Sequence, residues 1–193
     1  MDFRIMFLEL LSGLWVSVEI FLLTLVFALP LGLLIAFGRM SKIRIVRWIV
    51  QAYISIMRGT PLMLQLLMCF FGPYYLFNIP LAGGYRFVAV ILAFSLNYAA
   101  YFAEIFRAGI QAIPAGQYEA AKVLGYTRGQ TFLRIILPQV VKRVLLPVTN
   151  EVITLIKDTA LASTVAVVDL MTVAKKQVSS SSSIEPYVVA ILM

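Results

Sequence analysis

The chain has 193 residues, of which 62% are hydrophobic and only 13% are charged, and its formal net charge is +7. Soluble globular domains are closer to half apolar and a quarter charged, so this composition indicates surface that faces lipid. The basic residues lie in loops between apolar runs, which favours a membrane protein over one that binds nucleic acid. The chain has one cysteine, Cys69, and no histidine, which excludes an intrachain disulfide and leaves little with which to build a metal site or a histidine-based catalytic site.

The first predicted membrane helix covers about residues 13–37, where Glu19 is the only charge. A helix needs about 20 mainly apolar residues to cross a bilayer, and this run provides them. The loop that follows, residues 39–47, carries four basic residues and no acidic one. Loops of this kind lie on the cytoplasmic side, so the N-terminus is expected outside.

The second predicted span contains helix-breaking residues. It covers about residues 50–71 and is expected to kink near Gly59 and Pro61. An alternative interpretation begins the span at Leu62 and leaves Arg58 at the membrane interface.

The remaining apolar runs predict two further complete spans and the beginning of a fifth. Turn-forming residues at 72–84 predict an external loop, and the third span follows at about residues 87–106. A fourth span is expected at residues 144–168, after which residues 171–185 are interpreted as an external short helix that frays into a serine run. Residues 186–193 open another apolar helix that is too short to cross a bilayer, so the fifth span is interpreted as truncated.

Polar residues inside these spans predict a pathway through the membrane. Charges within spans are costly and usually face the interior of the helix bundle or a water-filled cavity. Three polar residues of the third span share one helix face, and two charges lie near the centre of the fourth. The predicted pathway residues are Arg58, Asn97, Tyr101, Glu104, Lys157 and Asp158.

Each of these residues also has a structural interpretation. Glu104 can pair with Arg107 three residues later on its own helix, and Arg58 can extend its charged end to the membrane interface. The two charges of the fourth span can form an ion pair with each other. Glu19 and Glu151 are interpreted as structural.

The longest polar interruption, residues 119–138, predicts two short helices on the cytoplasmic side. Good helix formers precede Gly125, and glycine tolerates the left-handed conformation with which many helices end. A second amphipathic run follows, and Pro138 is expected to close it. A hairpin of this kind on a membrane protein is typical of a docking element.

This stretch also carries a recognisable sequence pattern. Glu-Ala-Ala, three residues, Gly, nine residues and Ile-x-Leu-Pro resembles the signature loop of permease subunits of bacterial ABC importers. Two further stretches, residues 58–65 and 103–117, resemble the polar amino-acid branch of that family, and the resemblance extends over about residues 11–186. The positions that match the signature are Glu119, Ala120, Ala121, Gly125, Ile135, Leu137 and Pro138.

The resemblance implies a fold, a location and a set of partners. The fold is an all-α, polytopic membrane protein with about five transmembrane helices, in which residues 1–193 form a single permease domain and residues 114–138 form a cytoplasmic coupling loop. The implied location is the bacterial cytoplasmic (inner) membrane. The implied partners are a dimeric cytoplasmic ATP-binding subunit, a second permease subunit that is identical or homologous, an external solute-binding protein and an amino-acid substrate.

The chain is expected to be a transporter subunit and not an enzyme. It has no glycine-rich phosphate loop and no evident catalytic residues, so ATP and Mg²⁺ are expected to bind to the partner ATPase and no cofactor to this chain. An amino-acid zwitterion needs a group of each sign in its site. Glu104 or Asp158 would meet the ammonium group, and Lys157 or Arg58 the carboxylate.

Two other function classes remain open from the sequence. An ion-gradient-driven transporter or channel would use the same buried charges as an ion relay. A structural membrane scaffold would use them only to hold helices together. ATP-dependent uptake that requires a separate ATPase would distinguish the first class from both.

Overall fold

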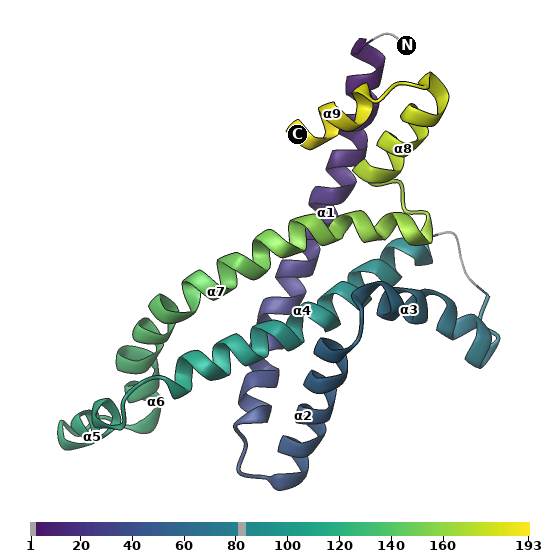
Figure 1. Ribbon diagram of the computed structural model, residues 1–193. Coiled ribbons are helices and arrows are strands. Elements are labelled where there is room, and N and C mark those ends of the chain that lie inside the picture. The colour runs from purple at the N-terminus through teal and green to yellow at the C-terminus, as the bar shows by residue number, and fades with distance from the viewer. Residues whose placement is uncertain (1–2, 81–83) are drawn as a thin grey trace. The chain divides into compact units, whose positions relative to one another are not determined.

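The computed structural model describes residues 3–80 and 84–193, and every regular element in these ranges is a helix (Figure 1). This confirms the prediction of an all-α membrane protein. Part of the predicted external loop, residues 81–83, lies outside the described residues. The elements are α1 (Phe3–Arg39), α2 (Arg44–Gly59), α3 (Leu62–Phe77), α4 (Tyr85–Gln111), α5 (Ala115–Val123), α6 (Arg128–Gln130), the π-helical segment η1 (Thr131–Ile136), α7 (Leu137–Asp158), the 3-10 segment η2 (Thr159–Val165), α8 (Leu170–Ser181) and α9 (Glu185–Leu192).

The chain forms two compact units, and each is assembled from separate parts of the sequence. One unit consists of residues 1–26, 60–96 and 154–193, and the other consists of residues 27–59 and 97–153. Helices α1, α4 and α7 each contribute to both units, so neither unit corresponds to a continuous segment.

Two of the described helices, α1 and α4, are long and apolar enough to cross a membrane. At 37 residues, α1 is about 55 Å long at ~1.5 Å per residue, whereas the hydrocarbon core is about 30 Å thick. The pair α2–α3 qualifies as a third crossing if the two helices are taken as one broken span. Helix α7, in the predicted fourth span, does not meet the same criteria. The number of crossings and their orientation therefore stay predictions.

The second predicted span is interrupted where the sequence indicated. The kink predicted near Gly59 and Pro61 is a full break in the structure, because α2 ends at Gly59 and α3 begins at Leu62. Pro61 has no N–H to donate and restrains the residue before it to extended conformations, so the helix cannot continue through Thr60. The side chain of Gln65 closes this break by donating to the carbonyl and to the hydroxyl of Thr60, at 3.1 and 2.7 Å.

In the unit of residues 27–59 and 97–153, α1, α2 and α4 meet in a buried cluster of three alanines and one isoleucine. The buried residues are Ala36, Ile54, Ala100 and Ala103. Gly32 of α1 lies so close to α4 that an added Cβ would be 2.8 Å from the Cβ of Phe102. Small residues let helix backbones approach closely, which is how helices associate when water provides no driving force between them.

The other unit joins the N-terminal part of α1 to α8 and α9, which lie beside it in Figure 1. At Gly13 the backbone of α1 lies close to the carbonyl oxygen of Asp169, because a Cβ added to Gly13 would be 2.9 Å from that oxygen. Ser17 accepts a hydrogen bond from the backbone N–H of Leu170 at 3.2 Å. The carboxylate of Asp169 caps α8 by accepting from the backbone N–H of Thr172 at 2.9 Å.

The prediction that the serine run frays is wrong for its first three residues, Ser179–Ser181, which belong to α8. Each of these hydroxyls donates to a backbone carbonyl in the preceding turn, at 2.7–3.0 Å. These bonds satisfy the side chains within the helix, so the serines do not need water for this purpose. The helix ends at Ser182, which adopts a left-handed conformation.

Candidate functional site

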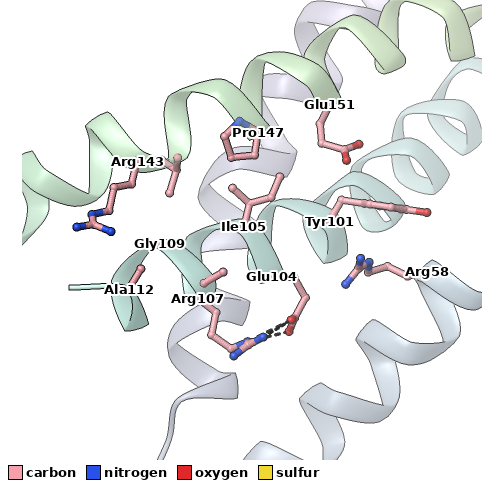
Figure 2. A pocket seen from close by; sticks show the side chains of 12 residues that line it. Arg58, Tyr101, Glu104, Ile105, Arg107, Gly109, Ala112, Arg143, Pro147 and Glu151 are labelled. Carbon is pink, nitrogen blue, oxygen red and sulfur yellow. Dashed lines mark hydrogen bonds and ion pairs between the residues drawn. The ribbon is translucent and has the colours of Figure 1, made fainter. Parts of the chain in front are cut away.

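A cavity of about 610 Å³ lies within the unit formed by residues 27–59 and 97–153 (Figure 2). Its wall combines the C-terminal end of α2 with one face each of α4 and α7. Three arginines and two glutamates belong to this wall, so it offers charges of both signs. The lining residues are Arg58, Tyr101, Glu104, Ile105, Arg107, Ala108, Gly109, Ala112, Arg143, Val144, Pro147 and Glu151.

Arg58 is positioned at the cavity by two contacts between α2 and α4. Its guanidinium carbon lies 5.2 Å from the centroid of the Tyr101 ring, which is a cation–π contact. One turn earlier on α4, Asn97 donates from its side-chain amide to the carbonyl of Met57 at 3.0 Å. Asn97 is only 4% exposed and does not line the cavity. The structure therefore brings Arg58 and Tyr101 together and gives Asn97 a helix-joining contact; a role for Asn97 in transport stays a prediction.

Glu104 is surrounded by arginines. Arg107 donates to both oxygens of its carboxylate, from Nη2 at 2.6 Å and from Nε at 3.1 Å, which forms a bidentate pair within α4. The same guanidinium also donates to the Gln111 side chain at 2.6 Å. Arg39, at the end of α1, lies 4.0 Å from Glu104. The sequence indicated the pair with Arg107 from its spacing, but nothing in the sequence pointed to Arg39.

A second, smaller cavity of about 190 Å³ lies in the same unit, and Arg58 and Glu104 line both cavities. Its other lining residues are Arg39, Gln51, Ile54 and Ser55. Two residues thus belong to the walls of two polar spaces, one of which contains Arg107 and the other Arg39. A charged group bound near Glu104 would therefore lie close to several arginine side chains and to one carboxylate.

The α7 wall of the larger cavity is one stripe of that helix. Arg143, Pro147 and Glu151 are spaced four residues apart, so they project from the same face. In the view of Figure 2 the Tyr101 ring lies between Glu151 on α7 and Arg58 on α2. The sequence interpretation of Glu151 as structural missed its place at the cavity. The sequence held a signal, because Glu151, Thr154 and Asp158 recur at helical spacing in the fourth predicted span and so lie on one face of it.

Close packing of α4 on α7 depends on Gly109. An added Cβ at this position would collide with Cγ1 of Val144 and would lie 3.4 Å from Cγ1 of Val140. Val140 and Val144 belong to a buried cluster with Ile113 and Ile136, which ties the end of α4 to the start of α7. The shape of the cavity beside Arg107 is set by this contact.

The other two predicted pathway residues lie in the last turn of α7, which belongs to the other unit. The side chain of Lys157 is exposed, and Asp158 is half-buried. Neither residue lines the two cavities described above. Their place in a pathway stays a prediction.

The predicted coupling loop is a hairpin with a precise turn. Gly125 has a φ of +78°, which confirms the left-handed conformation expected from the sequence. Tyr126 N–H donates to the Ala121 carbonyl and Gly125 N–H donates to the Lys122 carbonyl, both at 3.0 Å. This pair of bonds is the Schellman motif, which satisfies the last carbonyls of α5.

Two large apolar side chains are exposed beside the turn of this hairpin. Val123 is 88% exposed and Leu124 is 73% exposed at the end of α5, beside the turn. Of the signature alanines, Ala120 is exposed and Ala121 is buried, and Glu119 is exposed. Large apolar side chains exposed on a turn indicate a contact surface.

The helix that carries the second half of the signature continues through Pro138. The prediction that Pro138 closes the second helix is wrong, because α6, η1 and α7 follow one another without a gap and Pro138 lies in the first turn of α7. A proline inside a helix loses one hydrogen bond and crowds the carbonyl four residues earlier. The π-helical segment η1 precedes it directly, and its wider turn changes that spacing.

Several contacts connect the hairpin with the rest of its unit. Ile136 is fully buried in the cluster with Val144, and Ile135 and Leu137 are half-buried. Gln139 of α7 donates to the Gln117 side chain of α5 at 3.1 Å. The ring of Phe132 in η1 meets that of Phe37 of α1 edge-on, with centroids 5.9 Å apart. A displacement of α5 would therefore reach α1, α4 and α7.

Comparison with known proteins identifies the family. Residues 28–193 match the family described as "Binding-protein-dependent transport system inner membrane component". The L-cystine transport system permease protein TcyB of Bacillus subtilis is 41% identical over 159 residues, which is 82% of this chain and 66% of that protein. The arginine transport system permease protein ArtQ of Bacillus subtilis is 36% identical over 182 residues, which is 94% of this chain and 82% of that protein.

Solved structures agree with this relationship. The crystal structure of an amino acid ABC transporter with histidines superposes with a TM-score of 0.87 at 34% identity, covering all of this chain and 90% of that one. An inward-facing methionine ABC transporter has the same fold, with a TM-score of 0.72 at 21% identity. The resemblance first indicated by the signature loop is thus confirmed. The chain belongs to the family of binding-protein-dependent transport system inner membrane components.

Proposed function

We propose that this chain is the membrane-spanning permease subunit of an ATP-driven ABC importer that carries a polar amino acid across the bacterial cytoplasmic membrane. The observation that carries the proposal is the α5 hairpin, whose Schellman turn presents Val123 and Leu124 on the outside while its other side is tied to α7. The named relatives, which are an L-cystine and an arginine permease, support the substrate class.

The assembly proposed here contains several other subunits. A dimeric ATP-binding subunit binds ATP and Mg²⁺ on the cytoplasmic side and docks on the hairpin. A second permease subunit, identical or homologous, completes the pathway, and an external solute-binding protein delivers the substrate. Residues 1–193 serve as one permease domain in this scheme, and residues 114–138 serve as its coupling loop.

The larger cavity is proposed as part of the substrate pathway. An amino acid carries both charges, and leaving either one unpaired in a dry site is costly. Arg58 would meet the carboxylate, held in place by the face of the Tyr101 ring. Glu151, which lines the same cavity from α7, would meet the ammonium group.

The coupling role is tested at Gly125. In this chain nothing lies within 4 Å of a Cβ added to Gly125, so a substitution there acts through the backbone or through a docked partner. Valine in a left-handed conformation is strained by about 1–2 kcal/mol, whereas asparagine adopts that conformation more readily. Gly125→Val should therefore weaken ATPase docking or uncouple hydrolysis from uptake, and Gly125→Asn should do so much less.

The assay is reconstitution of the variant with its ATPase and its binding protein in proteoliposomes. Substrate-stimulated ATP hydrolysis and uptake of a radiolabelled amino acid are measured together. Uptake that follows an imposed ion gradient without ATP would contradict the proposed function. Normal stimulation and normal uptake by Gly125→Val would contradict the coupling role alone.

A further inference from the structure

The turn between α1 and α2 carries a cluster of basic residues in a stretch of the sequence without acidic residues. Four of them lie within residues 39–47, and the chain has no acidic residue between Glu19 and Glu104. Arg39 approaches Glu104, as described above. Lys42, Arg44 and Arg47 are exposed, and within the described parts of the chain their side chains form no hydrogen bond or ion pair. Three positive charges thus project from this turn without protein partners in the chain.

An exposed apolar row runs directly beside these charges. Ile45 is 71% exposed, Trp48 is 70% exposed and Ile49 is 57% exposed, all in the first turns of α2. At helical spacing, Arg44 and Arg47 form one row and Ile45 and Trp48 form the next, so the two rows lie side by side. Tyr53 and Met57, which pack against the buried core, lie on the side of α2 away from Trp48. The rows therefore face outward together.

This combination fits the boundary between lipid chains and lipid headgroups. Lysine and arginine extend their charged ends to headgroup level while apolar neighbours enter the hydrocarbon, and tryptophan is enriched at that depth. A small soluble anion would bind the arginines but would leave the apolar row in water. An anionic phospholipid satisfies both, since its phosphate meets the charges and its acyl chains meet Ile45, Trp48 and Ile49.

We propose that the basic face formed by Lys42 of the α1–α2 turn and by Arg44, Arg47 and Trp48 of α2 binds the headgroups of anionic phospholipids in the leaflet that this turn reaches. The inference rests on the membrane location of the family and not on the identity of the transported solute. Each lysine or arginine near an anionic membrane surface strengthens the attraction about fivefold. Removing two of these charges should therefore reduce the preference for anionic lipid by roughly tenfold or more.

The experiment uses Trp48 as a local reporter. The chain has two tryptophans, so Trp15→Phe leaves Trp48 as the remaining one. The full-length protein, with any subunits that co-purify, is placed in phosphatidylcholine nanodiscs that contain the same minor fraction of either brominated phosphatidylglycerol or brominated phosphatidylcholine. Enrichment of anionic lipid at the basic face should make quenching by brominated phosphatidylglycerol several-fold stronger.

Matched variants assign the effect to this face. Arg44→Gln/Arg47→Gln, in the Trp15→Phe background, should remove most of the difference in quenching between the two brominated lipids, since only Lys42 of the three charges remains. The control Lys175→Gln/Lys176→Gln removes two exposed charges from α8 and should leave the preference intact. Should the arginine pair variant fail to fold, the comparison of the two lipids in the Trp15→Phe protein still decides.

Four results would overturn the proposal. The first is equal quenching by both lipids in the Trp15→Phe protein, and the second is an unchanged preference in the arginine pair variant. The third is loss of the preference on addition of inorganic phosphate, which would indicate a site for a soluble anion. The fourth is loss of a co-purifying subunit from the arginine pair variant with the lipid preference retained, which would indicate a protein-binding face.

Discussion

The contact of Gly109 with Val144 leads to a prediction whose sign depends on the background. A methyl group added by Gly109→Ala would overlap Cγ1 of Val144, and both residues line the larger cavity. Alanine in place of a helical glycine stabilises by ~0.5–1 kcal/mol through the backbone. Overpacking a close contact costs roughly 1–3 kcal/mol. The cost of the overlap should exceed the backbone stabilisation, so Gly109→Ala should lower stability by up to about 2 kcal/mol.

Removing the opposing methyl groups should reverse this effect. Val144→Ala alone should destabilise by roughly 1–3 kcal/mol, because it leaves unfilled space at a buried contact. In the Val144→Ala background the new Cβ of Gly109→Ala fills part of the space. The stabilisation from replacing a helical glycine by alanine is then no longer opposed by an overlap with Val144. Gly109→Ala should therefore raise the stability of Val144→Ala, with a coupling energy of about 1–3 kcal/mol between the two positions.

The assay is thermal unfolding of the four proteins of this cycle, purified in one detergent and monitored by fluorescence and by size-exclusion chromatography. Gly72→Ala is the matched control, since this helical glycine of α3 has nothing within 4 Å of an added Cβ. It should leave the unfolding midpoint unchanged or raise it. If Gly109→Ala raises the midpoint of the wild type as Gly72→Ala does, or if Val144→Ala does not reverse its effect, the close α4–α7 contact is refuted.

Three further predictions concern charged groups. Burial raises the pKa of the Asp169 carboxyl, although hydrogen bonds from Thr172 partly oppose the shift. The folded state therefore holds its proton to higher pH than the unfolded state, so the contribution of Asp169 to stability falls as the pH rises from its usual pKa of about 3.9 through the raised folded value. In thermal scans the stability of Asp169→Asn relative to the wild type should rise across that pH window and stay constant above it. Asp169→Ala should lose the helix cap, which costs about 1 kcal/mol. An effect of Asp169→Asn on stability that does not change with pH would contradict the burial argument. Glu104→Gln should lower stability by roughly 1–3 kcal/mol and should lower ATP-dependent uptake, because it removes the anionic partner of Arg107. The double variant Glu104→Gln/Arg107→Gln should lose less stability than the two single variants together. Stability losses that add exactly in thermal scans would argue against the pair. Lys157→Ala should abolish uptake in proteoliposomes while the subunits still assemble, and uptake at the wild-type level would place Lys157 outside the pathway.

The substrate site is tested by a graded series at Tyr101. Tyr101→Phe keeps the ring face on which Arg58 lies and should transport almost normally. Tyr101→Leu removes that face, frees Arg58 and should raise the half-saturating substrate concentration severalfold, as Arg58→Gln should do more strongly. Equal transport by all four proteins would show that Arg58 does not meet the substrate.

The sequence by itself determined the features that depend on local chemistry. An excess of apolar residues in long runs requires helices in a membrane, because each helix satisfies its own backbone groups. Proline at 61 disfavours a helical conformation at the residue before it, and glycine at 125 adopts a left-handed turn that other residues resist. The spacing of Glu104 and Arg107 was enough to predict their pair. These conclusions needed no knowledge of what lies across the bundle.

Tertiary structure decided which distant groups meet. Arg39 reaches Glu104, Asn97 reaches the carbonyl of Met57, and Glu151 reaches the cavity wall, because of how each helix is rotated about its axis. A 3.6-residue period gives the relative positions of residues on one helix, but it does not say which face turns toward which neighbour. Pro138 likewise shows that the local rule by which proline ends a helix can fail. A π-helical turn precedes it and the helix continues, and Ile136 at the end of that turn is buried with Ile113 of α4 and Val140 and Val144 of α7. The proline's own preference indicates neither feature.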